Sequence, residues 1–401
     1  MNDRAGTSIK DGWRSIIWPA KLNRIPTEVF VHPDLFEEEL RRIFYGNEWI
    51  PIAHTGEIPN KGDFKTCNVG RIPLLVTRDA EDKVRVFLNA CTHRANQVET
   101  APSGNRLEFE CPYHRWLFNA DGRLVGGPFK PGDFTPDFTR EKYALRQPRT
   151  EIVHGLIMVT FGENTPPIGE YLEGLTDLMA DCMGGDGRLR LIGYQKVIYK
   201  ANWKFYTDND AYHAPLLHSA FRLLNWQGGK GGTIANNRGH RAATNQLKPL
   251  SANSFLKDPS LIEYRGGDLS KGSLTVRLFP IAAMVKHMDS IGIRFANPIS
   301  TNETEVYYGY YSREDDDEEM LRHRVRQSSN LLGPCGLVSM EDAAVFHRLH
   351  IGSNAPGEAV FLKGVQNEYE LPETFGQNDE SGNIPAWLHY RDLMGFEKET
   401  A

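Results

Sequence analysis

The chain has 401 residues and a formal net charge of −6, so its length suits two domains and its acidic balance argues against nucleic acid as a partner. Hydrophobic residues make up 40% and charged residues 24% of it, as in a globular protein that works in water. No apolar run approaches the roughly eighteen residues of a membrane helix, and the first residues lack the apolar segment of a signal peptide. The five cysteines show no disulfide rhythm, so we expect a reducing cytoplasm.

The first predicted element is a helix over residues 33–44. Pro33 suits the first helical position, acidic residues follow it at the positive end, and Arg41 and Arg42 lie near the negative end. From Trp49 onward the pattern changes to short apolar runs at 49–53, 72–77 and 84–88, which are separated by turn residues. This pattern predicts a small all-β domain over residues 45–155, preceded by a helical part, 1–44, and followed by a second domain, 156–401.

The β domain contains a metal-binding pattern. Cys91-Thr92-His93 is followed, after seventeen residues, by Cys111-Pro112-Tyr113-His114. A structural zinc would take four such ligands, usually as a cysteine pair and a histidine pair. Here each half supplies one Cys and one His, which favours a Rieske [2Fe–2S] cluster, in which two thiolates hold one iron and two imidazoles hold the other.

The second domain mixes strands and helices. Residues 188–200 predict a long strand that leads into Asn202-Trp203-Lys204, and further strands are expected at 273–279, 290–296 and 304–311. A helix is expected from Arg313 to Leu331, with acids at its start and arginines later. Residues 226–272 are rich in Gly, Asn and Ser and predict a long mobile loop, of the kind that often forms a lid. The fold class is therefore α+β, with an antiparallel sheet and packed helices.

A second metal site is suggested by Asp210, His213 and His218. Two histidines and a carboxylate can hold non-haem Fe(II) with positions open for oxygen. On one straight helix, five residues rotate by about 140°, so the two histidines would point apart unless Pro215 breaks the helix. Asp210 would share a face with His213 and is better placed to orient it than to bind metal. The alternative is a pair of ordinary histidines.

These motifs, together with Gly333-Pro334-Cys335-Gly336 and Ser339-Met340-Glu341-Asp342, resemble the α subunit of the Rieske non-haem iron ring-hydroxylating oxygenases. The resemblance is nearest to the members that act on aromatic carboxylates, of the terephthalate and salicylate type. It implies an all-β Rieske domain inserted in a catalytic domain of helix-grip type. The one departure in the cluster motif is Arg115, which stands where the family usually has glycine.

The resemblance also implies residue roles. Cys91, His93, Cys111 and His114 would hold the cluster. His213, His218 and Asp342 would hold the mononuclear iron, and Asp210 would link His213 to His114 of a neighbouring subunit by accepting a hydrogen bond from each. Asp342 has an alternative role, because Ser339 could cap a helix in which Asp342 only favours the helix dipole. Glu341 is the fallback third ligand.

The implied function is that of a terminal oxygenase component. Electrons would pass through the Rieske cluster to Fe(II), which activates O2 and hydroxylates a small aromatic substrate. No dinucleotide fingerprint and no plant-type ferredoxin cysteine run is present, so a separate NAD(P)H-dependent reductase, a ferredoxin or both must supply the electrons. The family implies an α3 or α3β3 assembly, the latter with a small β subunit. Competing interpretations are an O- or N-demethylating monooxygenase on a non-benzoate substrate, a pure Rieske electron carrier and a zinc-stapled binding module.

Arg294 is the candidate substrate contact. Alternation along 290–296 places Gly292, Arg294 and Ala296 on one face of a strand. An arginine between two small residues leaves room for a ligand, and its planar fork suits a carboxylate. The alternative is a cross-strand ion pair with Glu305. No second arginine stands near Ile384, which disfavours a dicarboxylate, so we expect an aromatic monocarboxylate.

Overall fold

The computed structural model describes residues 12–130, 132, 134–209, 214–218, 231–247, 258, 261, 263–266 and 273–399. The chain forms two compact units, one of residues Asn47–Thr165 and one that joins Met1–Gly46 to Pro166–Ala401. The boundaries predicted at 44/45 and 155/156 lie close to these, and the second differs because a strand pair continues the smaller unit past residue 155. No described helix is long and apolar enough to cross a membrane.

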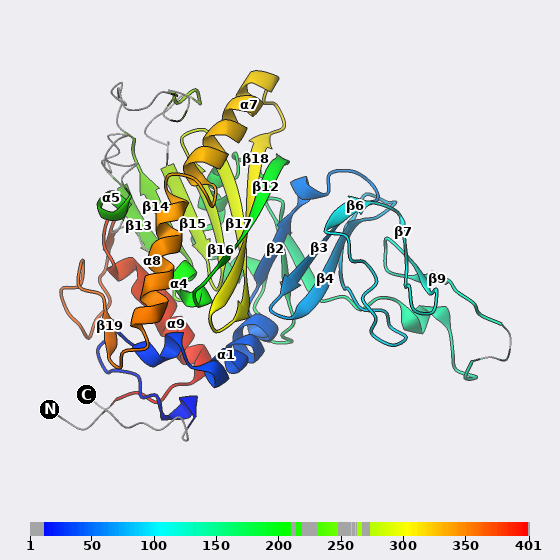
Figure 1. Cartoon of the computed structure of the whole chain (residues 1–401), viewed down its shortest axis with the longest axis horizontal. Coiled ribbons are helices and arrows are strands. Elements are labelled where there is room, and N and C mark those ends of the chain that lie inside the picture. The colour runs from blue at the N-terminus through cyan, green and yellow to red at the C-terminus, as the bar shows by residue number, and fades with distance from the viewer. Residues whose placement is uncertain are drawn as a thin grey trace. The chain divides into compact units, whose positions relative to one another are not determined.

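The smaller unit is built from antiparallel strands, coloured from blue through cyan to blue-green in Figure 1. The apolar runs predicted as strands form β2 (Ile50–His54), β4 (Ile72–Arg78) and β5 (Val84–Leu88). One sheet has the order β5-β4-β3-β6, with β3 at Asp63–Val69 and β6 at Ser103–Asn105. A second sheet joins β10 (Arg149–Val153), β11 (Leu156–Thr160) and β2. A third sheet joins β7 (Glu108–Glu110), β8 (Leu117–Asn119) and β9 (Leu124–Gly126). Aromatic side chains from these strands, Phe64, Phe87 and Phe109 among them, form one apolar core with Cys91 and Cys111.

The larger unit is organised around an eight-stranded antiparallel sheet of order β12-β18-β17-β16-β15-β14-β13-β20. Its strands are β12 (Leu189–Tyr199), β13 (Gly231–Ala235), β14 (Arg241–Asn245), β15 (Ser273–Leu278), β16 (Ala282–His287), β17 (Ser290–Ser300), β18 (Glu303–Arg313) and β20 (Phe375–Gly376). A separate pair joins β1 (Arg24–Pro26) to β19 (Glu358–Val360). Even-numbered residues of β17 share a face with odd-numbered residues of β15 and β16, because Arg294 lies opposite Ala283 and Ala283 lies opposite Arg277.

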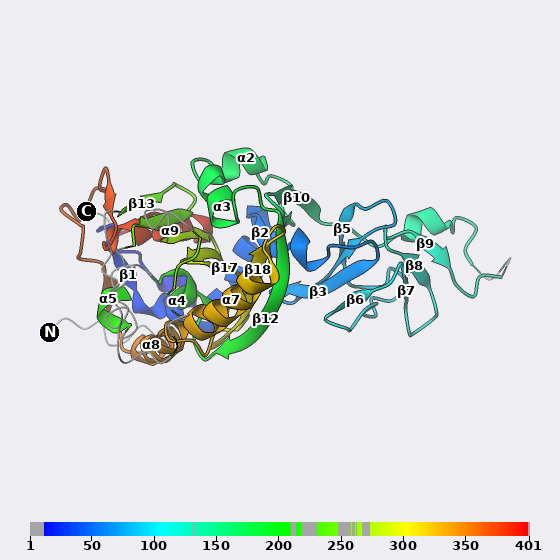
Figure 2. The same cartoon turned by 90° about the horizontal axis from the view of Figure 1, so that it is seen from above.

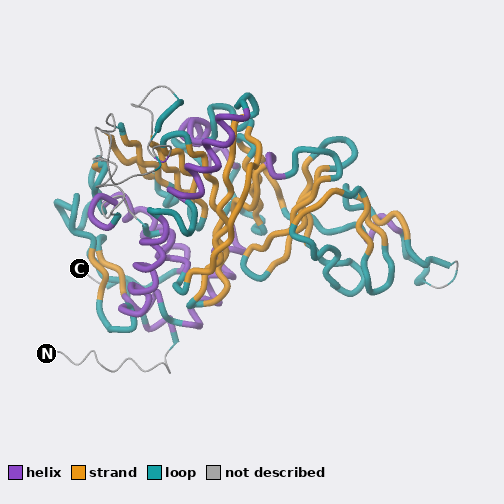
Figure 3. Tube along the Cα trace, turned by 45° about the horizontal axis from the view of Figure 1, so that its top comes forward, coloured by secondary structure: helices purple, strands orange, loops and turns teal. Residues whose placement is uncertain are grey.

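Helices cover both faces of this sheet. Helices α2 (Ile168–Tyr171) and α3 (Thr176–Cys182) lie on one side, and α4 (Trp203–Thr207), α7 (Glu318–Gln327) and α8 (Ser339–Gly352) lie on the other, as Figure 2 shows. The other α-helices among the described residues are α1 (Pro33–Glu39), α5 (Ala214–Leu217) and α9 (Ile384–Met394). Figure 3 shows helices (purple) packed beside the long strands (orange) of this sheet. The predicted α+β class, with a helix-grip catalytic domain, is confirmed.

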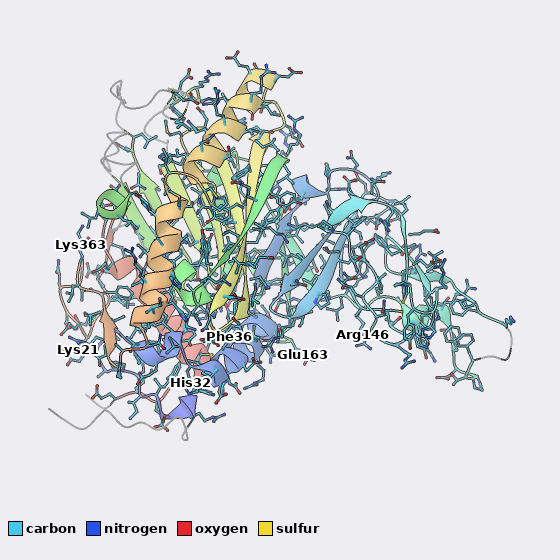
Figure 4. The ribbon with its side chains drawn as sticks, viewed as in Figure 1. Lys21, His32, Phe36, Arg146, Glu163 and Lys363 are labelled. Atoms are coloured by element: carbon cyan, nitrogen blue, oxygen red, sulfur yellow. The ribbon has the colours of Figure 1, made fainter. Side chains whose placement is uncertain are left out.

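The first predicted helix is shorter than expected in its regular part. Pro33 stands in its first turn and His32 accepts a hydrogen bond from the backbone N–H of Leu35, so the helix begins where the sequence indicated. Figure 4 shows His32 and Phe36 at this helix. After Glu39 the chain continues as a wider π-type turn over Leu40–Asn47.

Two expectations about elements are wrong. The helix predicted from Arg313 begins at Glu318, because Arg313 ends β18 and Asp317 caps the helix by accepting from the backbone N–H of Met320. The predicted loop over 226–272 contains β13 and β14, which are hydrogen-bonded members of the main sheet. Much of the remaining stretch lies outside the described residues, so the lid stays a prediction.

Candidate functional site

Two loops of matching geometry carry the four predicted cluster ligands. In the first loop, the Cys91 N–H donates to Asn96 O at 2.8 Å and the Ala95 N–H donates to Cys91 O at 2.8 Å. The second loop repeats the pattern, from Cys111 N–H to Trp116 O at 2.8 Å and from Arg115 N–H to Cys111 O at 3.0 Å. The fifth residue of each loop closes the turn in the left-handed region, with φ of 57° at Ala95 and 60° at Arg115.

The loops place the cysteines inside and the histidines outside. Cys91 and Cys111 are buried, and burial, with Cys111 next to it, raises the pKa of the Cys91 thiol. The rings of His93 and His114 lie 4.5 Å apart between centroids. Burial, and then the neighbouring His114, lowers the pKa of His93, which favours the neutral ring that binds metal. A thiol pair in the core and an imidazole pair nearer the surface fit a cluster with one iron held by each pair.

The predicted helix break between His213 and His218 lies between two short helices. Helix α4 ends at Thr207 and α5 begins at Ala214, so Pro215 stands in the first turn of a separate short helix, where proline is tolerated. His218 follows the end of α5 and is only 2% exposed. Asp210 and His213 lie outside the described residues.

Helix α8 brings two carboxylates to His218. The Nε2 atom of His218 lies 3.3 Å from Oδ1 of Asp342, and its Nδ1 atom lies 3.1 Å from Oε2 of Glu341. A neutral imidazole has one N–H donor and one lone pair. If Nδ1–H donates to Glu341, the Nε2 lone pair faces the Asp342 carboxylate, and a cation is then needed between these two bases. The pair fits two ligands of one metal ion, with Glu341 in the carboxylate–histidine–metal arrangement.

The helix-capping part of the alternative role of Asp342 is wrong, but Asp342 does lie in the first turn of α8, where its carboxylate favours the helix dipole. Helix α8 begins at Ser339, and no side chain caps its preceding residue, Val338. The Ser339 hydroxyl donates instead to Leu332 O at 3.0 Å. Among the described residues, no group of three His, Cys, Asp or Glu side chains surrounds a single metal position; a Rieske iron takes two protein ligands, and His213 lies outside the described residues.

Arg294 is buried beside α8. One terminal nitrogen, Nη2, donates to Leu332 O at 3.0 Å and lies 3.5 Å from Ser339 Oγ. Its guanidinium lies 4.6 Å from the ring centroid of Tyr308, the residue opposite it on β18. The strand register excludes the alternative of an ion pair between Arg294 and Glu305. Glu305 lies opposite Asn297, and its carboxylate is 3.5 Å from Lys196 Nζ.

A buried charge pair that sequence reasoning missed lies under α4. Lys204 and Glu39 form an ion pair in which both side chains are almost fully enclosed. Glu39 also accepts from Trp203 Nε1 at 2.7 Å and from the Tyr390 hydroxyl at 2.6 Å. Burial lowers the pKa of Lys204, although Glu39 opposes this. The signal in the sequence was a lysine in an otherwise apolar helix; its partner could not be found, because it lies far away in the chain.

Comparisons with known proteins give the family. A profile described as the Rieske [2Fe-2S] domain matches residues 48–139, and one described as the ring hydroxylating alpha subunit (catalytic domain) matches residues 186–371. The chain is 31% identical, over 96% of its length and 98% of the relative's, to the terephthalate 1,2-dioxygenase terminal oxygenase component subunit alpha 2 of Comamonas sp. It is 28% identical, over 93% of its length and 94% of the relative's, to the anthranilate 1,2-dioxygenase large subunit of Burkholderia cepacia.

Solved structures agree on the fold. The naphthalene 1,2-dioxygenase from Rhodococcus sp. superposes with a TM-score of 0.81 at 21% identity, over 92% of this chain and 94% of the other. The predicted resemblance, including its nearness to enzymes named for aromatic carboxylates, is thus confirmed. The chain belongs to the α subunits of the Rieske ring-hydroxylating oxygenases, which are oxidoreductases that use a Rieske [2Fe–2S] cluster, a mononuclear iron and O2.

Proposed function

We propose that this oxygenase hydroxylates an aromatic monocarboxylate and that Arg294 binds the carboxylate. The observation that carries the proposal is a buried cation on the strand face that adjoins the metal-binding helix. The described groups that hydrogen-bond or stack on Arg294 are a carbonyl, a hydroxyl and an aromatic ring, all of them neutral. Burial disfavours the charge of Arg294, while nearby tyrosines and the Asp342 carboxylate raise its pKa. A buried guanidinium is stabilised when an anion completes its contacts.

The metal ligands we assign are Cys91, His93, Cys111 and His114 for the cluster, and His213, His218 and Asp342 for the mononuclear iron. The support is the paired thiols and imidazoles of the two loops and the contact of His218 with Asp342. The irons supply electron transfer and O2 activation. The protein's part is to hold each imidazole in one tautomer, which Glu341 does for His218, and to exclude water from the buried ligand pair.

The strand face beside Arg294 has room for a ring. Four small or medium residues lie in one cross-strand row next to the row of Arg294, and all are partly exposed although they sit in the middle of the sheet: Ala243, Thr275, Val285 and Gly292. A Cβ atom placed on Gly292 would meet only ordinary contacts, the nearest being Gly309 O at 3.7 Å and Val285 O at 3.8 Å. A small side chain therefore fits above the partly exposed Gly292, and we assign the space beyond it to the substrate ring.

The relatives support an anionic substrate. Two are named for terephthalate and anthranilate, and a third is the salicylate 5-hydroxylase large oxygenase component of Ralstonia sp, 27% identical over 82% of this chain. Demethylation of a cationic substrate is less supported. The quaternary ammonium Rieske monooxygenase shares the fold at a TM-score of 0.75, but a cation placed here would face the charge of Arg294.

Electrons would come from a separate reductase, a ferredoxin or both, and the working assembly would be a trimer of this chain, alone or with a small β subunit. We propose that Asp210 connects the two metal centres across neighbouring subunits, accepting one hydrogen bond from His213 and one from His114 of the adjacent chain. The support is the family membership and the spacing of Asp210 and His213 in the sequence.

The substrate proposal is tested by kinetics of Arg294→Gln on matched pairs of benzoate-type acids and their amides. A hydrogen bond to a charged group contributes about 1.5–3 kcal/mol, so KM for the acid should rise roughly tenfold to hundredfold while KM for the amide changes little. Because Arg294 also holds Leu332 and Ser339, iron content is measured in the same samples as the control. Equal changes for acid and amide in fully iron-loaded enzyme would refute the carboxylate contact.

The ring position is tested by Gly292→Ala and Gly292→Val. Both variants should fold, because the added Cβ meets only ordinary contacts and the further methyl groups of valine would extend towards the space that we assign to the ring. Turnover of the bulkiest accepted acids should fall first with Ala and further with Val, while the unsubstituted acid is affected least. Thr244→Val, an exposed change on the opposite face of β14, is the matched control. If large and small acids lose activity equally in Gly292→Val, the ring lies elsewhere.

A further inference from the structure

Four successive backbone carbonyls at the end of α4 each accept a hydrogen bond from a side chain of another element. Tyr206 O accepts from Arg277 Nη1 at 3.2 Å. Thr207 O and Asn209 O both accept from Arg241 Nη2, at 2.6 and 2.8 Å. Asp208 O accepts from Asn383 Nδ2 at 2.6 Å. We call this set of contacts the carbonyl clamp.

The donors of the carbonyl clamp come from rigid parts of the fold. Arg241 on β14 lies directly opposite Arg277 on β15, inside the eight-stranded sheet. Asn383 is buried just before α9. It also donates to the Asp208 carboxylate at 3.1 Å, to which Trp387 Nε1 donates at 2.7 Å. Two strands and one helix terminus therefore fix the same four residues.

This clamp exceeds what a helix of five residues needs. The last carbonyls of a helix lack partners within it and are satisfied by side chains, by water or by a tightened last turn, and cations are favoured near them by the helix dipole. Here the clamp extends beyond the helix to Asn209, whose carbonyl shares one nitrogen of Arg241 with Thr207. The backbone is held up to the residue that immediately precedes Asp210.

The cross-strand row that contains Arg241 also reaches the chain segment that precedes α8. Across neighbouring strands, Arg241 lies opposite Arg277, Arg277 opposite Ala283, and Ala283 opposite Arg294. Arg294 holds the Leu332 carbonyl, just ahead of the helix that carries Asp342. One row of arginines thus holds backbone on both chain segments from which the iron ligands are drawn.

We propose that Arg241 is a positioning residue for the mononuclear iron, which it serves by fixing the backbone from which Asp210 and His213 continue. This inference rests on the proposed function, because it takes His213 as an iron ligand. Because the backbone is already fixed at Asn209, less conformational entropy is lost when His213 binds the metal. Arg277, whose hydrogen bond to Tyr206 O is longer, at 3.2 Å, and whose acceptor is further from Asp210 along the chain, has a smaller role.

The experiment compares Arg241→Gln, Arg241→Lys and Arg277→Gln with Arg324→Gln as the matched control. Arg324 is as buried as Arg241, at 6% against 7% exposed, but it binds Asp316, in the turn between β18 and α7, at 2.6 and 3.1 Å. For each variant, three quantities are measured: the affinity of the mononuclear site for Fe(II), the Rieske electron paramagnetic resonance signal, and amide hydrogen exchange in peptides from 203–218. Lysine keeps the charge and the donors but is one bond shorter.

Loss of a partner that orients a metal ligand typically lowers metal affinity about 10- to 100-fold. We expect about tenfold weaker Fe(II) binding in Arg241→Gln, a smaller loss in Arg241→Lys and the smallest in Arg277→Gln. Exchange in 203–218 should rise in the same order, with the Rieske signal unchanged. Arg324→Gln should lower thermal stability without changing iron affinity or exchange in this stretch.

Two results would overturn the inference. Unchanged exchange in Arg241→Gln would show that the carbonyl clamp does not hold the backbone. Faster exchange with unchanged iron affinity would show an anchor that does not position the metal. Failure of the proposed function looks different: the wild-type protein would then hold no iron beyond that of the cluster, and Arg241 would be a backbone anchor alone.

Discussion

In the catalytic domain, Nε2 of His218 and Oδ1 of Asp342 lie 3.3 Å apart. The Asp342→Ala variant should lose the mononuclear iron and all oxygenation while it keeps the Rieske signal, because we assign separate ligands to the two metal sites. Glu341→Gln keeps an acceptor for the Nδ1–H of His218, so it should retain iron with affinity weakened by no more than about tenfold. Metal analysis measures the iron content of both variants, and electron paramagnetic resonance measures their Rieske signal. If Asp342→Ala kept its iron and Glu341→Ala lost it, Glu341 would be the iron ligand and Asp342 would be the residue that orients His218.

The Asp210→Ala variant separates a bridge between metal centres from a residue that only orients His213. A bridging carboxylate makes charge-assisted hydrogen bonds to both imidazoles, so its loss should leave cluster and iron in place but make reoxidation of the reduced cluster by O2 very slow with substrate bound. Single-turnover stopped-flow measurement of the Rieske absorbance checks this. Normal reoxidation in a fully iron-loaded sample, or an active monomer, would contradict the bridge.

Ala95 and Arg115 hold the two cluster loops in the left-handed backbone region, with φ of 57° and 60°. An L-residue there costs about 1–2 kcal/mol, and glycine relieves it at an entropic cost of about 0.5–1 kcal/mol. Ala95→Gly should therefore be neutral or stabilise by up to about 1 kcal/mol. Arg115→Gly should gain less, because it also loses an exposed ion pair with Glu110 at 2.8 Å.

The matching substitutions to valine test the same geometry in the other direction. A β-branched residue at positive φ is a strong outlier, so Ala95→Val and Arg115→Val should each destabilise by more than about 1 kcal/mol. Thermal loss of the cluster's visible absorption measures all four variants. If valine were tolerated as well as glycine, the left-handed turns would not be part of how the loops hold the cluster.

His240 should make the stability of the catalytic domain depend on pH. It is fully buried, and its Nδ1 accepts a hydrogen bond from the backbone N–H of Phe279 at 3.0 Å. Burial lowers its pKa from 6.5 to about 3. Below pH 6.5 the unfolded chain therefore takes up a proton that the folded chain refuses. The stabilisation is fully present above pH 6.5 and is lost progressively as the pH falls towards 3.

His240→Asn keeps an acceptor for Phe279 and removes the titration. Between pH 7 and pH 5 the free energy of unfolding should fall by about 2 kcal/mol less in this variant than in the wild type. His287, which is also buried with a pKa of about 3, should give a similar effect, and the double variant should show the sum. Urea unfolding at the two pH values measures it. If the free energy of unfolding depended on pH in His240→Asn as it does in the wild type, the His240 ring would be protonated or exposed in the folded wild-type protein.

Several features followed directly from the sequence because local physics decides them. The run 84–88 became β5 at the same residues, since alternating β-branched and aromatic residues between turns have few other conformations. The helix at Pro33 began where proline and the acids placed it. Strands β13 and β14 were missed because a glycine-rich run such as Gly231–Ala235 has no pattern of its own, and only the neighbouring strands complete its hydrogen bonds.

Much of the chemistry could be read from local sequence: the Cys and His spacing of the two loops, the small–Arg–small face of β17, and a family in which a second iron follows. Which residues meet depends on the fold. Glu341 and Asp342 are neighbours in the chain, and the rotation of α8 against His218 places one at Nδ1 and the other at Nε2. Likewise, strand register set Arg294 opposite Tyr308 instead of near Glu305. Such pairings depend on contacts between residues far apart in the chain, which no local pattern records.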